Sequence, residues 1–193
     1  EENPDVHYLG AMVHMVFCAH DAAGPDCRWS DAENYLQKAL KLRPDMRDAK
    51  NALGVVLVHR KRPAEAIVLL RELAHDILYR SPEKAWGNLG WAYLEAGQVD
   101  DAIPALERAI AAQPMFCVGH YRLGLAYEKK NEYKAAKNAL TRALKVSEGG
   151  CGRMQEAFLV RARVGLKLGL LPQVQKDLQQ CQKLAAFTVT GKA

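Results

Sequence analysis

The chain has 193 residues, a net charge of +5 and an apolar content of 49%. Its 27 basic and 22 acidic residues are mixed along the sequence, whereas nucleic-acid binding calls for a basic face with interleaved aromatic residues. No stretch reaches the roughly 18 consecutive apolar residues that a membrane span requires. We therefore expect no nucleic-acid partner and no membrane-spanning segment in this sequence.

The first predicted element is a helical hairpin over about residues 3–46. Leu9 and Gly10 mark its first helix, and Ala32 marks the second, which Pro44 follows. Gly10 and Ala32 stand 22 positions apart, whereas the matching glycine and alanine of later hairpins stand 12 apart. About ten residues are therefore inserted between these two helices.

A second hairpin is predicted over residues 47–82, where Gly54 and Ala66 occupy the same two positions at the normal spacing. The turn between its helices carries the basic run His-Arg-Lys-Arg at 59–62. We interpret this run as a solvated turn whose positive charges are favoured by the C-terminal end of the preceding helix.

The third and fourth hairpins, residues 83–116 and 117–150, repeat the same residue types at the same offsets. The third has Trp86, Leu89, Gly90, Tyr93, Ala102, Leu106, Ala109 and Pro114, and the fourth has His120, Leu123, Gly124, Tyr127, Ala136, Leu140 and Ala143. A period of 34 residues with this pattern resembles the tetratricopeptide repeat, a helix-turn-helix unit. Glycine persists inside a helix mainly where backbones approach closely, so Gly90 and Gly124 are expected to contact Ala102 and Ala136.

A fifth, degenerate hairpin is predicted over residues 154–187, where Gly169 and Leu178 align with the positions of Gly97 and Leu106. The predicted fold is all-α: one domain, residues 1–193, forming a right-handed superhelical solenoid of about five tetratricopeptide repeats. The terminal repeats are expected to turn a polar face to water.

The positions of the five cysteines indicate an exported protein. Cys18 ends the first helix and Cys27 lies in the insertion, so a bridge between them would close that loop. Cys117 opens the fourth hairpin and Cys151 follows it, and the two ends of an antiparallel hairpin are neighbours. Cys181 stands at the repeat offset that Ala109 and Ala143 occupy, which holds a small, inward-facing side chain. Two disulfides and one buried thiol are typical of an oxidising compartment, although five reduced thiols in a cytosolic protein remain an alternative.

Metal and catalytic sites are weaker interpretations of the same residues. His14 and Cys18 stand four positions apart on one helix face, which is a spacing that zinc ligands use, but no second pair completes a known site. Cys117 and His120 could form a nucleophile and its base, but His120 takes the tryptophan offset, which is a core position. No phosphate loop, zinc-protease motif or serine elbow is present. We expect no enzymatic activity, no metal and no cofactor.

A tetratricopeptide array binds partners in a concave groove lined by the first helix of each hairpin. The residues at the groove-facing offsets form an apolar centre with a polar rim. They are Val55, Lys84, Trp91, Leu94, Glu95, Tyr121, Leu125 and Glu128. The alternative for Trp91 is packing against the next repeat. The carboxylate clamp of chaperone-tail adaptors, which uses Lys, Asn and Arg, is not reproduced at these offsets.

The run from Asp76 to Tyr93, with Cys117 at the head of the next helix and the later Cys151 and Cys181, resembles the tetratricopeptide lipoproteins of type IV pilus biogenesis, the Tgl and PilF/PilW pilotins. The resemblance extends over most of the chain. It implies a bacterial lipoprotein on the periplasmic face of the outer membrane, which binds secretin subunits and promotes their assembly into the pilus pore.

The acylated N-terminal cysteine of that family has no counterpart in this sequence. We expect a lipid anchor only through a segment upstream of Glu1, and a monomeric chain. The alternative function is that of a generic intracellular tetratricopeptide scaffold that binds a partner peptide.

Overall fold

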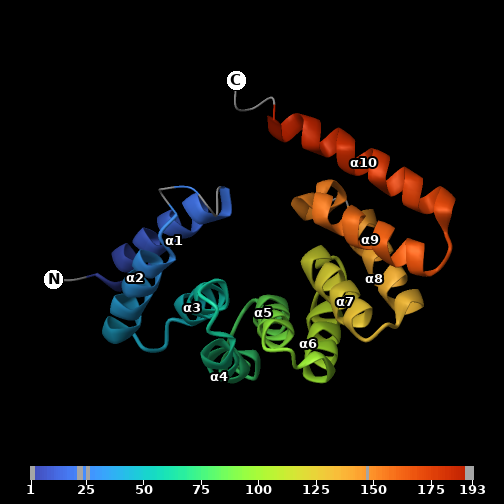
Figure 1. Ribbon diagram of the computed structural model, residues 1–193. Coiled ribbons are helices and arrows are strands. Elements are labelled where there is room, and N and C mark those ends of the chain that lie inside the picture. The colour runs from blue at the N-terminus through green and yellow to red at the C-terminus, as the bar shows by residue number, and fades with distance from the viewer. Residues whose placement is uncertain (1–2, 21–23, 25–26, 147, 190–193) are drawn as a thin grey trace. The chain divides into compact units, whose positions relative to one another are not determined.

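The computed structural model describes residues 3–20, 24, 27–146 and 148–189. These residues form ten α-helices and one short 3-10 helix, and they contain no β-strand. The helices are α1 Pro4–His20, α2 Trp29–Leu42, α3 Arg47–His59, α4 Pro63–Ala74, α5 Pro82–Glu95, α6 Val99–Ala112, α7 Cys117–Lys129, α8 Tyr133–Lys145, α9 Gln155–Lys167 and α10 Leu171–Val189, with the 3-10 helix η1 at Glu148–Arg153. The all-α prediction is therefore confirmed (Figure 1). Four of the predicted hairpins are formed by paired helices, α1 with α2, α3 with α4, α7 with α8 and α9 with α10.

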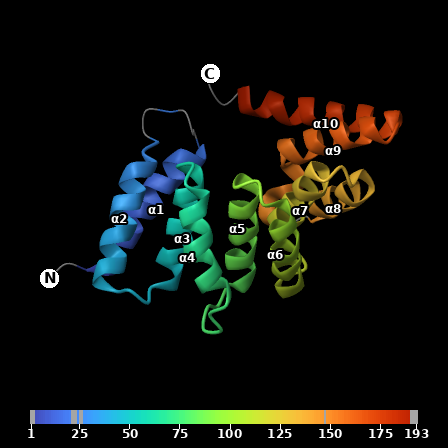
Figure 2. The same ribbon diagram turned by 60° about the horizontal axis from the view of Figure 1, so that its bottom comes forward.

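The helices gather into two compact units, Glu1–Gln98 and Val99–Ala193. In the first, hereafter unit 1, α1 pairs with α2 and α3 pairs with α4, while α5 packs beside both α3 and α4 (Figure 2). Small and branched side chains form one buried cluster between α1, α2 and α3, namely Ala11, Ala32, Leu36, Ala49, Ala52 and Val56. The insertion predicted between the first two helices lies partly outside the described residues.

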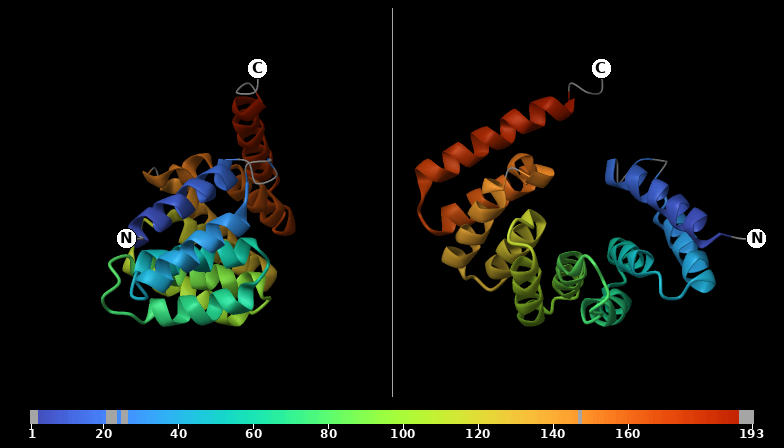
Figure 3. Two further views of the ribbon diagram at one scale, coloured as in Figure 1. Left: turned by 90° about the vertical axis from the view of Figure 1, so that its left-hand side faces the viewer. Right: turned by 180° about the vertical axis from the view of Figure 1, so that it is seen from behind.

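In unit 2, the residues from Val99 onwards, α7 pairs with α8 and α9 pairs with α10, while α6 packs on α7. Figure 3 shows α9 and α10 lying side by side along the C-terminal end of the unit. Alanine and leucine of α8 meet two valines of α9 in its core, at Ala136, Leu140, Val160 and Val164.

Two glycines allow the paired helices of a hairpin to approach closely. A Cβ atom placed on Gly54 would lie 2.5 Å from Cγ of Leu70, and one on Gly124 would lie 2.6 Å from Cγ of Leu140. Gly124 also faces the backbone oxygen of Ala136, at 3.4 Å from that added atom. These distances are too short for any side chain, which explains why glycine stands at this offset.

The turn inside each of the last four hairpins ends its first helix with a residue in the left-handed conformation. Gly97 and Gly169 take this position with φ of 76° and 69°, and Lys61 and Asn131 take it with φ of 61°. The next backbone N–H then reaches back to a carbonyl five residues earlier, as from Arg62 to Leu57 over 2.9 Å. This arrangement is the Schellman cap, and it turns the chain sharply into the second helix.

The exposed side of α1 differs from the polar face that we expect at the end of a repeat array. Its side chains Val6, Leu9, Val13, Val16 and Phe17 are between 49% and 64% exposed. They recur every three or four residues, so they form one apolar stripe along the helix. The expectation of a polar N-terminal face is therefore wrong, whereas the opposite side of α1 packs on α2 as predicted.

Candidate functional site

Side chains from three helices of unit 1 form a column of aromatic rings. Trp29 begins α2, His59 ends α3 and Trp91 lies within α5. The rings of Trp29 and His59 are stacked, with centroids 4.0 Å apart and planes inclined by 10°. The rings of His59 and Trp91 are arranged edge to face, with centroids 4.9 Å apart and planes inclined by 74°. Both tryptophans are half-buried and His59 is exposed, so the column presents a partly exposed aromatic surface.

The predicted groove residues of unit 1 differ in their exposure to solvent. Val55 is half-buried beside the aromatic surface, and Lys84 and Glu95 are exposed, as a polar rim requires. Leu94 is only 4% exposed, so it belongs to the packing of its helix and is withdrawn from the groove. Trp29 was not predicted, because it begins the second helix of its hairpin, whereas the predicted groove offsets belong to the first helix.

The basic turn of the second hairpin is tied to a buried carboxylate, and this corrects its interpretation as a solvated turn. Glu33 of α2 is 3% exposed and accepts hydrogen bonds from Arg60 and Arg62. Arg62 also binds Glu65 at 2.6 Å, and this bond holds the pKa of the Glu65 carboxyl below its usual value. A buried carboxylate needs such partners, so the two arginines fasten the first hairpin to the second.

Lys61 is the member of this run that behaves as predicted. Its side chain is 81% exposed, and its Nζ lies 3.4 Å from a carboxylate oxygen of Glu95. The pair links the α3–α4 turn to the end of α5. Lys61 therefore adds a positive charge to the rim beside Glu95, and dissolved salt weakens the attraction between the two side chains.

In unit 2, the predicted groove residues are partly covered by the following hairpin. Tyr121 and Leu125 of α7 pack against the cluster that contains Val160 and Val164 of α9. Their half-buried environment raises the pKa of the Tyr121 hydroxyl, mainly through desolvation. Glu128 accepts a hydrogen bond from Nη2 of Arg163 at 2.7 Å, and this pair fastens α7 to α9.

Trp91 belongs to unit 1 and Tyr121 belongs to unit 2. Unit 1 contributes the aromatic column, and unit 2 contributes half-buried side chains beneath α9.

Both predicted cysteine pairs lie at bonding distance. Cys18 and Cys27 form a disulfide with Cα atoms 4.3 Å apart, and Cys117 and Cys151 form one with Cα atoms 6.0 Å apart. The thiol of Cys181 is buried. The second disulfide, with Val146, is the core of a small cluster that closes the fourth hairpin.

The side chains considered as metal or catalytic candidates serve packing. His14 stacks on Tyr35 with ring centroids 5.6 Å apart, and Nε2 of His120 lies 3.0 Å from the backbone oxygen of Pro114. Cys18 and Cys117 are joined to other cysteines. Within the part of the chain that the structure describes, no three His, Cys, Asp or Glu side chains gather as a metal site.

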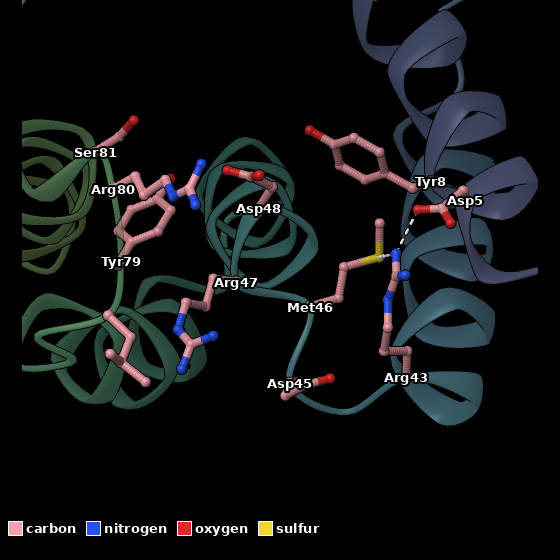
Figure 4. A pocket seen from close by; sticks show the side chains of 11 residues that line it. Asp5, Tyr8, Arg43, Asp45, Met46, Arg47, Asp48, Tyr79, Arg80 and Ser81 are labelled. Atoms are coloured by element: carbon pink, nitrogen blue, oxygen red, sulfur yellow. Dashed lines mark hydrogen bonds and ion pairs between the residues drawn. The ribbon is translucent and has the colours of Figure 1, made fainter.

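A polar hollow of about 560 Å³ lies in unit 1 where the first turns of α1 and α3 meet the α4–α5 loop (Figure 4). Asp48 lies in it between Tyr8 and Tyr79, and burial raises the pKa of both phenols. Two of the arginines that line it have acidic partners: Arg43 binds Asp5, and Arg47 binds Asp76 outside the hollow at 2.6 Å. Most of the lining of the hollow is charged or polar, so it does not form an apolar recognition surface.

Sequence profiles of the tetratricopeptide repeat match residues 28–83, 83–116 and 117–149. Together they cover well over half of the 193 residues, and the chain belongs to the tetratricopeptide-repeat family. Proteins built from such repeats are protein-interaction scaffolds. A comparison with curated proteins found no match.

Solved structures with the same fold include two pilus proteins. PilW, a widely conserved type IV pilus biogenesis factor, is 22% identical with a TM-score of 0.76, over 94% of this chain and 77% of its own. PilF from Pseudomonas aeruginosa is 20% identical with a TM-score of 0.70, over 94% and 76%. MamA is 22% identical with a TM-score of 0.67, over 84% and 91%. At these identities the likeness concerns the fold. Among the described residues, no helix is long and apolar enough to cross a membrane.

Proposed function

We propose that this protein is a non-enzymatic assembly factor of type IV pilus biogenesis, a pilotin that binds secretin subunits. The observation that carries a binding function is the aromatic column of Trp29, His59 and Trp91 on unit 1. Support for the particular partner comes from the sequence run between Asp76 and Tyr93 and from the shared fold of PilW and PilF.

The chemistry of the column favours an apolar segment of a protein partner. Two indoles and an imidazole provide a large, rigid contact area that loses little conformational entropy on binding. Lys84 and the Lys61–Glu95 pair provide a charged rim that orients the partner without dominating its affinity. In such interfaces a few aromatic anchors account for most of the binding energy, about 1 to 4 kcal/mol each on truncation.

The two disulfides support an oxidising compartment, as the periplasm provides. Attachment to the outer membrane by a lipid is part of the same proposal and rests on the sequence resemblance. A generic intracellular scaffold would keep its thiols reduced. Alkylation under denaturing, non-reducing conditions therefore separates the two: a pilotin isolated from its host should expose one reactive thiol, Cys181, and five labelled thiols would exclude the exported protein.

Binding is tested with Trp91→Ala, which removes the half-buried indole at one end of the column. We expect unchanged far-ultraviolet circular dichroism together with loss of secretin multimers and of pili. Tyr121→Ala tests the half-buried surface of unit 2 in the same assays. The matched control is Arg108→Ala, an exposed position of α6, which should support normal assembly.

The pattern of outcomes decides between surfaces. Loss of secretin assembly with Trp91→Ala alone would place the partner on unit 1. If both aromatic variants assemble secretin normally, the proposed binding surfaces are wrong. If deletion of this protein from its host leaves secretin assembly unchanged, the proposed pilotin function itself is wrong.

A further inference from the structure

Unit 2 carries a second recessed surface, on the side formed by α6 and α8. Two hollows of about 400 and 380 Å³ lie between these helices, with α7 as their floor. They share Ile110, His120 and Arg142, so they form one continuous trough. The trough follows α8 from Ala135 in its first turn to Val146 just after its last.

The trough arises from a change at a single repeat position. His120 stands at the offset that Trp86 occupies one repeat earlier. An imidazole fills much less volume than an indole, and the side chain of His120 is held down by the carbonyl oxygen of Pro114 at 3.0 Å. The space that a tryptophan would fill is thus left open above His120, which is itself only 6% exposed.

Apolar side chains line part of the trough at both of its ends. Ile110 and Leu123 lie beside His120, and Ala139 keeps the α8 wall low. At the other end the lining is continued by Pro114 and Met115, of which Met115 is 48% exposed. This lining suits a bulky apolar side chain, because exposed apolar concavities gain free energy when they are filled.

The rim of the trough carries a net positive charge. Glu107, the acidic residue of the rim, already accepts a hydrogen bond from the Tyr127 hydroxyl at 3.0 Å. Arg142 and Lys145 lie one turn apart on α8 and are both exposed, and neither has an ion-pair partner among the described residues. An occupant with a carboxylate next to its apolar side chain would satisfy both features of the surface.

We propose that this trough docks an extended internal segment of a partner protein. A bulky apolar side chain of that segment rests over His120, and a neighbouring aspartate or glutamate binds Arg142 and Lys145. From Ala135 to Val146 the helix rises about 16 Å, at 1.5 Å per residue. An extended segment of about five residues has this length. The trough therefore fits several consecutive residues of an internal segment better than the terminal residue of a chain. The surface is independent of the aromatic column of unit 1.

The test begins with a selection of binding peptides. Random heptapeptides are displayed on phage inside a flexible linker, so that neither chain end is free, and are selected on the oxidised wild-type protein. We expect the enriched sequences to share a large apolar residue adjacent to Asp or Glu. No enrichment, or enrichment of sequences without a carboxylate, would overturn the proposal, as would binding that requires a free C-terminus.

The most enriched peptide is then labelled with fluorescein, amidated at its C-terminus and measured by fluorescence anisotropy. His120→Trp restores the residue of the preceding repeat and fills the trough, and Arg142→Glu reverses one exposed rim charge. Each should weaken binding about tenfold or more, equivalent to about 1.4 kcal/mol. Lys176→Glu makes the same charge change at an exposed position of α10 and should leave the affinity within about twofold.

Arg142→Glu keeps the test decisive if His120→Trp does not fold, because position 142 is exposed on α8. A peptide that binds both trough variants as tightly as the wild-type protein docks elsewhere, and the inference is then wrong.

Discussion

The groove-facing side chains of the first helix of a hairpin are covered to different extents in the two units. In unit 1, His59 of α3 and Trp91 of α5 join Trp29 in a column of rings that stays partly open to solvent. In unit 2, Tyr121 and Leu125 of α7 pack beneath α9, where the Glu128–Arg163 pair fastens the cover. The repeat offset decides which side of a helix a residue occupies, but the neighbouring hairpin decides whether that side remains available to a partner.

The largest expected effect concerns the hairpin that provides this cover. Asp177 of α10 is 1% exposed and accepts two hydrogen bonds from Arg161 of α9, at 2.9 and 2.6 Å. Arg161→Ala leaves a buried carboxylate without its cation and should lower the free energy of unfolding by about 3 to 5 kcal/mol. Chemical denaturation measures the loss, and hydrogen exchange should show it first in α9 and α10.

Arg163→Ala, two positions away on the same helix, is the matched control. Its side chain is 59% exposed, so its pair with Glu128 should contribute about 1 kcal/mol or less. Equal losses for the two variants would mean that the cover of unit 2 is not anchored through Asp177.

The two disulfides close loops of different length, one in each unit. They join cysteines 9 positions apart in unit 1 and 34 positions apart in unit 2. In the chain-entropy model the shorter loop stabilises by about 3 kcal/mol and the longer by about 4 kcal/mol. The double variant Cys117→Ser with Cys151→Ser should therefore lower Tm somewhat more than Cys18→Ser with Cys27→Ser. The reverse order would show that the first loop is held mainly by native contacts.

The glycine offset should behave alike in both units, since Gly54 and Gly124 face a leucine at nearly the same distance. Gly54→Leu and Gly124→Leu should each cost about 1 to 3 kcal/mol or more by overpacking. Gly152→Ala is the control, because its added Cβ would meet nothing closer than 3.6 Å. A Gly124→Leu variant that melts like the wild-type protein would refute the register of the fourth hairpin.

The smallest effect is a pH dependence confined to unit 1. The pKa of Asp76 is lowered by the hydrogen bond from Arg47 at 2.6 Å and by the backbone N–H of Leu78 at 2.9 Å. Its native form binds a proton less readily than its unfolded form, whose pKa is about 3.9. The stabilisation is therefore complete above that value and is lost as the pH falls through the lower native pKa. Asp76→Asn should flatten this acid limb of the stability curve, while Asp101→Asn, an exposed position, should leave it unchanged.

Local chemistry made most of the architecture predictable from the sequence. The glycine and alanine offsets located the hairpins because a close helix contact tolerates only small residues, as Gly54 and Gly124 show. Cysteine positions indicated the two pairs because the ends of one hairpin, or of one inserted loop, are near each other in any packing.

Predictions failed where a residue depends on a partner distant in the chain. The basic turn at Arg60 and Arg62 binds Glu33, which lies 27 and 29 positions earlier. No local pattern signals this contact, because glutamate on a helix is usually solvated. Leu94 has a groove-facing offset and is nevertheless buried, since an apolar side chain is covered wherever neighbouring helices leave room for it.

The sequence by itself determined the helical hairpins, their register and the family of the chain. These depend on periodicity and on side-chain size, which are short-range properties of each repeat. Only the tertiary structure decided which surfaces are available: the column that joins Trp29 to His59 and Trp91, the cover over Tyr121, and the trough above His120. Exposure is a property of how hairpins stack, because the same offset is buried or open according to the volume and charge of the side chains that the next hairpin brings.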